Sequence, residues 1–124
     1  MNTVAAAVEA ATGIALITYP LGVARLLLGA DLAAAGIAVG RVAGVALLSL
    51  GVVCWMSRQA ADRTPALSAM LTYNLLVTTY LAYLAFDGEL GGILLLPAIA
   101  LHAVLTLLFA YVWFVDQQTE ATTP

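Results

Sequence analysis

The chain has 124 residues, of which 9% are charged and 64% are hydrophobic. About a quarter of the residues of a soluble domain are charged, so this chain cannot form a water-facing surface of ordinary composition. At about 20 residues per membrane-spanning helix, four spans use roughly 80 residues and leave only short loops and tails. The sequence therefore predicts a polytopic membrane protein with a single transmembrane domain over residues 1–124.

The identity of the few polar residues excludes several classes of function. The chain has four arginines and no lysine, which removes Schiff-base cofactors and Walker-type nucleotide binding. With a net charge of −3, the scattered arginines cannot form the basic stripe that nucleic acids require. Cys54 is the single cysteine, so neither a disulfide nor a thiolate metal site can form within the chain. We therefore expect no enzyme activity, no cofactor or metal, and no nucleotide or nucleic-acid partner.

Runs of uncharged residues predict four helices. The first two runs are shorter than a full span and must include charged residues at their ends, namely Glu9, Arg25 and Arg41, which can reach the membrane interface. We expect Glu9 to do so, and the alternative is a proton-coupling carboxylate. The predicted helices and the polar C-terminal tail cover about residues 6–27, 37–56, 66–86, 90–114 and 115–124. Because the connections are short, consecutive helices should be antiparallel neighbours. The predicted fold class is all-α, an antiparallel four-helix transmembrane bundle.

Two prolines interrupt these predicted helices. Pro97 cannot donate a backbone hydrogen bond, so it should kink the fourth helix or mark its effective start. Pro20, directly after Tyr19, should act in the same way on the first helix. Kinks toward the outer half of both helices could open a small cavity beside Arg41, where a lipid headgroup or a small amphiphile would bind.

Arginine placement predicts the orientation of the chain. The loop between the second and third helices contains Arg58 and Arg63. The opposite side also has two arginines, but one of them, Arg41, lies inside a span. Trp55 and Trp113 both fall on the side of Arg58, as expected of interfacial anchors. We therefore expect a bacterial inner-membrane protein with both termini in the cytoplasm.

The second predicted helix has a stripe of glycines. They are Gly36, Gly40, Gly44 and Gly51. Glycines four residues apart allow a neighbouring helix to approach closely, which is how helices associate in lipid. We expect the stripe to pack against the first or third helix of the same chain, and the alternative is an interface between two copies.

Arg41 lies among these glycines, about one turn below the outer interface and level with Tyr80 and Tyr83. An arginine inside a span normally faces a partner or a water-filled cavity, because its charge is costly in lipid. We expect it to pair with Glu89 or Asp87 in the adjacent turn. The alternative is an arginine that reaches the interface and only anchors the helix end.

A second polar group is predicted near the middle of the membrane. Asn74 and His102 each fall about twelve residues from the outer ends of their helices, which places them at similar depth. An ionisable residue at the midplane suggests a functional site, and histidine titrates near physiological pH. We expect His102 to contact Asn74 or Tyr73, either as a functional site or as a neutral link between helices.

Four short motifs lie along the second to fourth helices. They are Gly40-Arg41-x-x-Gly44, Tyr73-Asn74, Gly88-Glu89, and Pro97 followed by Leu101-His102. In these motifs, in size and in arrangement, the chain resembles DoxX-like proteins, small four-helix proteins of bacterial membranes. The resemblance implies a four-helix fold and an inner-membrane location, and it assigns no catalytic residue.

Two functions follow from these patterns. The first is a non-enzymatic accessory or interaction subunit that associates, with another copy or with a membrane-protein partner, through the glycine groove of the second helix. The alternative is a small oligomeric transporter, or a protein that binds lipid or an amphiphile, which uses Arg41, Asn74, Glu89 and His102. The lipid bilayer is a partner in both.

Overall fold

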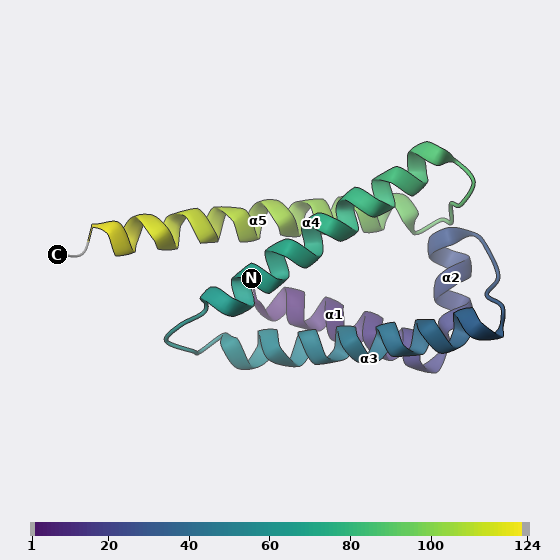
Figure 1. Cartoon of the computed structure of the whole chain (residues 1–124), viewed down its shortest axis with the longest axis horizontal. Helices are drawn as coiled ribbons and strands as arrows, with labels where there is room; N and C mark the ends of the chain where they lie inside the picture. The colour runs from purple at the N-terminus through teal and green to yellow at the C-terminus, as the bar shows by residue number, and fades with distance from the viewer. Residues whose placement is uncertain (1, 123–124) are drawn as a thin grey trace.

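A computed structural model describes residues 2–122, and all regular elements within this range are α-helices. They are α1 (Asn2–Thr18), α2 (Pro20–Leu28), α3 (Ala34–Ser57), α4 (Thr64–Asp87) and α5 (Leu95–Ala121) (Figure 1). The helices α3, α4 and α5 are each long and apolar enough to cross a membrane. The bent pair of α1 and α2 passes the same test if it is counted as one span. The chain is thus an all-helical, multi-pass integral membrane protein.

The helix predicted over residues 6–27 is broken at Tyr19, where Pro20 was expected to kink it, and α2 leaves α1 at an angle of 116°. Pro20 occupies the first position of α2, where its missing N–H group leaves no hydrogen bond unmade. The short α2 ends at Gly29, whose positive φ of 67° closes the helix with a bond to the Arg25 carbonyl. The 17 residues of α1 are about 25 Å long, slightly less than the ~30 Å of a typical hydrocarbon core.

The last helix differs from its predicted range at both ends. It starts at Leu95 instead of residue 90, and Pro97 therefore lies in its first turn, where it marks the start and causes no kink. It also continues through the predicted tail to Ala121, because residues 115–121 contain neither glycine nor proline. This extension projects beyond the other helices (Figure 1). The bounds of α3 and α4 lie within about three residues of the prediction.

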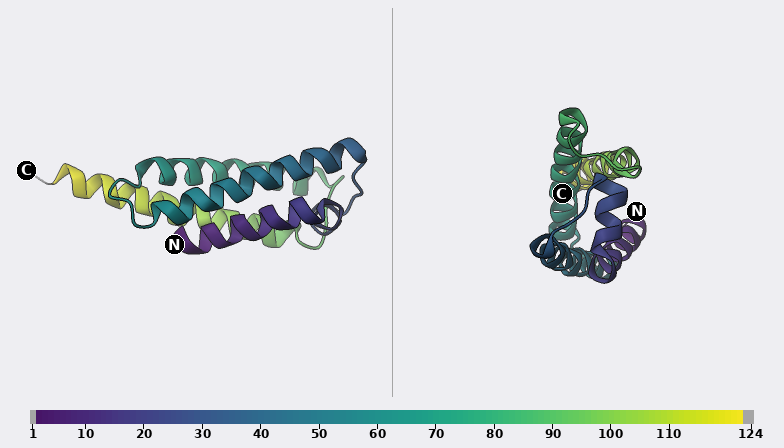
Figure 2. Two further views of the ribbon diagram at one scale, coloured as in Figure 1. Left: turned by 90° about the horizontal axis from the view of Figure 1, so that it is seen from below. Right: turned by 90° about the vertical axis from the view of Figure 1, so that its right-hand side faces the viewer.

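The long helices form two pairs. Helix α1 packs along α3, and α4 packs along α5, whereas contact between the pairs is sparse. Successive long helices run in opposite directions, α4 is inclined to α5, and α2 lies across one end between the pairs (Figures 1 and 2). The alternating direction is that of the predicted bundle, but the sparse contact between pairs leaves a closely packed four-helix bundle unconfirmed.

Glycines bring the backbones of α1 and α3 into contact. A Cβ atom added to Gly44 would lie 2.7 Å from the carbonyl oxygen of Gly13, and one added to Gly13 would lie equally close to that of Gly44. At Gly51 an added Cβ atom would lie 3.0 Å from the backbone of α1. The first helix therefore fills the middle and the end of the glycine stripe from within the chain.

The loop before α5 is bonded to the end of α2. The amides of Gly92 and Leu94 donate to the carbonyls of Leu27 and Leu26 over 3.0 and 2.7 Å. These carbonyls belong to the last turn of α2 and have no partner within that helix. The bonds join the two helix pairs at this end of the molecule.

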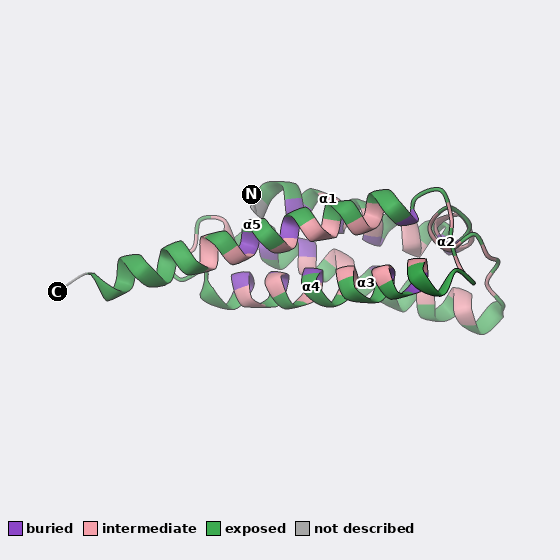
Figure 3. Cartoon of the chain, turned by 90° about the horizontal axis from the view of Figure 1, so that it is seen from above, coloured by how far each residue is buried: buried purple, intermediate pink, exposed green. Residues whose placement is uncertain are grey.

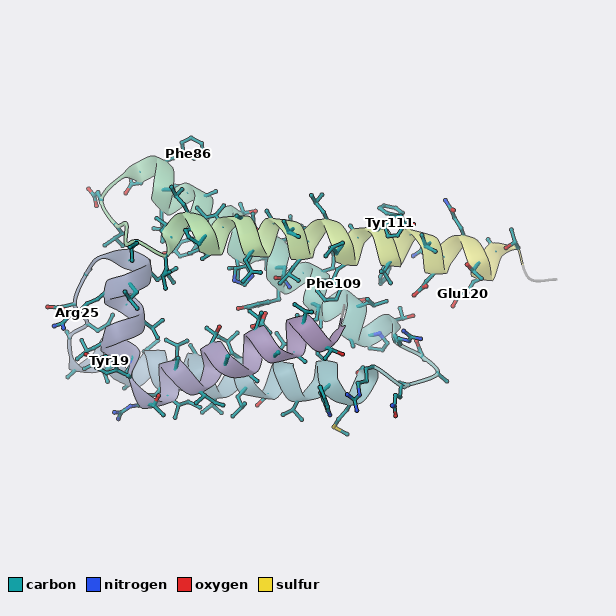
Figure 4. All side chains as sticks on the ribbon, turned by 180° about the vertical axis from the view of Figure 1, so that it is seen from behind. Tyr19, Arg25, Phe86, Phe109, Tyr111 and Glu120 are labelled. Carbon is teal, nitrogen blue, oxygen red and sulfur yellow. The ribbon has the colours of Figure 1, made fainter. Side chains whose placement is uncertain are left out.

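Apolar packing is concentrated where the helices face one another. The larger of two buried clusters contains Ala5, Ala6, Cys54, Leu67, Met70, Leu105 and Phe109. Buried positions lie on inward sides and the outer faces are exposed (Figure 3). Phe109 points inward, whereas Phe86 and Tyr111 point away from the molecule (Figure 4). Such extensive exposed apolar faces are suited to lipid.

Candidate functional site

Glu9 of α1 is buried inside the molecule and is only 1% exposed. The expectation that it reaches the membrane interface is therefore wrong. Helix α1 begins at Asn2, so Glu9 lies about two turns, or roughly 10 Å, along the helix, and a glutamate side chain is too short to span that distance. It shares one face of α1 with Ala5 and Gly13, which are buried against the neighbouring helices.

The carboxyl group of Glu9 lies near two side chains of other helices. Tyr73, on α4, lies close enough to interact with this carboxyl group. Cys54 of α3 is also buried and lies close enough to interact electrostatically with Glu9. The Oε1 atom of Glu9 has no hydrogen-bond partner within residues 2–122. No arginine neutralises the group, since the ion pair between Arg25 and Asp31 is the one found within residues 2–122.

His102 of α5 and Asn74 of α4 are joined by a hydrogen bond of 2.8 Å between Nδ1 and Oδ1. Asn74 is fully buried, and its Nδ2 atom donates to the carbonyl of Met70 over 2.8 Å. Its amide is thereby oriented with Oδ1 as the acceptor, so Nδ1 of His102 is the donor. In the neutral ring Nε2 is then an acceptor, and no described residue donates to it.

Tyr73 connects these two groups. Its ring meets the His102 ring edge to face, with the centroids 5.9 Å apart and an interplanar angle of 78°. We use the term polar cluster for Glu9, Tyr73, Asn74 and His102. We expected His102 to contact Asn74 or Tyr73, and it contacts both. Glu9 was expected at the interface and not in this site, although its four-residue spacing from Ala5 and Gly13 indicated an inward face.

The residues expected to surround Arg41 are not brought together. Arg41 is exposed and makes no ion pair with a described residue. Asp87 and Glu89 are exposed at the end of α4 and in the turn that follows. Tyr80 and Tyr83 stack on each other at 6.5 Å, and each is 61% exposed. The expected pair with Glu89 or Asp87 is absent because α3 packs mainly against α1 and has little contact with α4.

The first two glycines of the stripe also have neighbours within the chain. A Cβ atom added to Gly40 would lie 3.2 Å from Cβ of Pro20, and one added to Gly36 would lie 3.3 Å from the side chain of Leu32. All four glycines therefore face parts of the same chain. A second copy or another protein could reach Gly44 or Gly51 only by displacing α1.

Two surface hollows lie away from the polar cluster. They are found where α4 begins and α5 projects, and are lined by residues that include Thr64, Trp113, Asp116 and Glu120. Exposed residues form most of this lining, so it lacks the buried, desolvated groups that distinguish the polar cluster.

Comparison of the chain with models of protein families, with curated proteins and with solved structures finds no match. Within residues 2–122 there is no group of three or more histidine, cysteine or acidic side chains that could hold a metal ion. The polar cluster instead offers two unpartnered acceptors, Oε1 of Glu9 and Nε2 of His102, inside a membrane protein.

Proposed function

We propose that the chain is a non-enzymatic protein of the bacterial inner membrane that binds a small solute at the polar cluster, as a small transporter or solute-binding protein. The observation that supports this most directly is the buried carboxyl group of Glu9, whose Oε1 atom has no partner. Leaving a buried polar atom unsatisfied costs about 1–3 kcal/mol. Ionisable residues within membrane spans mark solute and ion pathways, which gives such a group a function that offsets this cost.

This proposal replaces the accessory subunit that associates through the glycine groove. That function needs an accessible stripe on α3, and Gly44 and Gly51 are covered by α1. Of the residues named for the alternative, Asn74 and His102 remain in the proposed site, while Arg41 and Glu89 lie outside it. Glu9 and Tyr73 take their place. The similarity to DoxX-like proteins contributes only the proposed location and fold.

Native mass spectrometry of the protein extracted from its own membrane tests this function. We expect a bound small molecule with the wild-type chain and none with Glu9→Gln. The matched control is Glu89→Gln, the same change at an exposed carboxyl group, which should retain the bound molecule. A protein partner without any small molecule, or a molecule that Glu9→Gln retains, would contradict the proposal.

A further inference from the structure

We propose that the ligand of the polar cluster is a small protonated amine, a monovalent cation with N–H donors. In this arrangement Glu9 is the counterion, Nε2 of His102 accepts a second hydrogen bond, and the Tyr73 ring lies beside the cation. This inference rests on the proposed function and specifies the chemical class of the solute.

A buried carboxyl group is neutral when it is protonated, and when Glu9 is ionised the site calls for one positive charge beside it. Glu9 is the one acidic residue buried among the helices, since the other six lie in turns or at helix ends and are exposed. An ionised carboxylate in a desolvated site is strongly unfavourable unless a cation lies beside it. No arginine supplies that cation within the described chain, so a bound monovalent cation would balance the site.

The hydrogen-bonding groups of the site favour a cation that carries N–H donors. The ionised Glu9 offers Oε1 as an acceptor. His102 offers Nε2 as an acceptor, because Asn74 accepts from Nδ1 of the same ring. A protonated amine has donors for both atoms, whereas a quaternary ammonium ion has none. One carboxylate and one imidazole provide too few ligands for a divalent metal ion. The aromatic face of Tyr73 adds the attraction that a ring exerts on a cation.

The position of the cluster gives a route for entry. Glu9 belongs to the pair of α1 and α3, whereas Tyr73 and His102 belong to the pair of α4 and α5. The cluster therefore lies at the junction of the two pairs, where contact is sparse. A small separation of the pairs would admit a ligand to Glu9 without unwinding a helix.

Equilibrium binding of radiolabelled methylammonium to the purified full-length protein in detergent micelles, at constant ionic strength in sodium chloride, tests the inference. We expect saturable binding of one methylammonium per chain. Tetramethylammonium should compete at least roughly tenfold less well, because it cannot donate hydrogen bonds to Glu9 or His102. Glu9→Gln should abolish saturable binding, while Glu89→Gln should bind as the wild type does.

A second variant tests the inference even if Glu9→Gln fails to fold. His102→Phe keeps an aromatic ring beside Tyr73 but removes Nε2, and it should weaken binding by roughly tenfold. Absence of saturable binding to folded wild-type protein, or equal competition by tetramethylammonium or by added sodium, would overturn the amine proposal. If mass spectrometry still shows a Glu9-dependent small molecule, the ligand class alone is wrong. If neither assay shows Glu9-dependent binding, the proposed function is wrong as well.

Discussion

At the scale of single residues, Asn74 determines how His102 presents its ring. The amide donates to the Met70 carbonyl and accepts from Nδ1 of His102, so both of its ends are used while it is fully buried. The hydroxyls of Thr78 and Thr106 are satisfied by the carbonyls one turn before them, at Asn74 and His102. These groups of α4 and α5 are thus paired internally, as a lipid surrounding requires, and Oε1 of Glu9 stands out by contrast.

Replacement of Asn74 by alanine should leave Nδ1 of His102 without its acceptor. We expect a loss of about 1–3 kcal/mol in the free energy of unfolding, because a buried donor becomes unsatisfied. Chemical denaturation in detergent micelles measures this loss. The control Thr79→Ala removes an exposed hydroxyl from the same helix and should change stability by less than about 0.5 kcal/mol. Equal effects of the two substitutions would show that the bond to His102 contributes nothing.

The exposed ion pair between Arg25 of α2 and Asp31 has a measurable electrostatic effect. The Arg25 guanidinium, which is hydrogen-bonded to Asp31, holds the pKa of that carboxyl group below its ordinary value. The stabilisation from this pair is present above the ordinary pKa of aspartate and is lost as the pH falls through the lowered value. Arg25→Gln should raise the Asp31 pKa, measured by a carbon-13 NMR titration of its carboxyl group. An unchanged pKa would contradict the pairing.

At the scale of the elements, the close approach of α1 to α3 depends on glycine at the contact. Gly13 and Gly44 face each other so closely that neither can carry a side chain without a shift of the backbone. Glu9 lies one turn before Gly13 on α1, so the same contact holds Glu9 in the interior. The glycine stripe therefore serves the site indirectly, by positioning the helix that carries its carboxyl group.

Gly44→Ala should lower the free energy of unfolding by about 1–3 kcal/mol, because the added methyl group meets backbone atoms that cannot move independently. Gly91→Ala is the matched control, since its added Cβ atom meets only the end of the Leu95 side chain at 3.7 Å. Denaturation of both variants in the same detergent measures the difference. If Gly44→Ala instead reduced self-association and left stability unchanged, the stripe would be an interface between copies.

At the scale of the whole molecule, the two helix pairs are held together at few places. The bonds from Gly92 and Leu94 to α2 join them at one end, and the larger apolar cluster joins them nearer the other. The polar cluster also crosses the boundary between pairs, where Tyr73 lies close to Glu9. The polar cluster therefore lies where the two pairs have little contact, and this is the side from which the proposed ligand would enter.

The proposed orientation of the whole chain can be tested with cysteines introduced into a Cys54→Ala background. A cysteine replacing Glu120, at the projecting end of α5, should react with a membrane-impermeant maleimide in inside-out vesicles only. A cysteine replacing Glu89, in the turn before α5, should react in right-side-out vesicles only. Labelling of both positions from both sides would show that the chain inserts in two orientations, and the reversed pattern would place the termini outside.

The membrane class and the approximate helix positions could be predicted because they depend on local composition. The scarcity of charge requires lipid as the solvent, and the uncharged runs locate α3 and α4 to within about three residues. The depth of Asn74 and His102 was also predictable, since a helix rises by a constant amount per residue. Their contact followed because both residues face inward on paired helices.

The burial of Glu9, the exposure of Arg41 and the partner of the glycine stripe were decided only by the tertiary structure. Each depends on which helices pair and on where a helix starts. Neither of these features can be inferred from hydropathy along the chain. An acidic residue near a predicted helix end looks accessible until a neighbouring helix covers it, as happens to Glu9. By itself the sequence determined that lipid surrounds the chain and approximately where its spans lie, because both depend on local composition. Packing between distant segments decided which polar groups form the site.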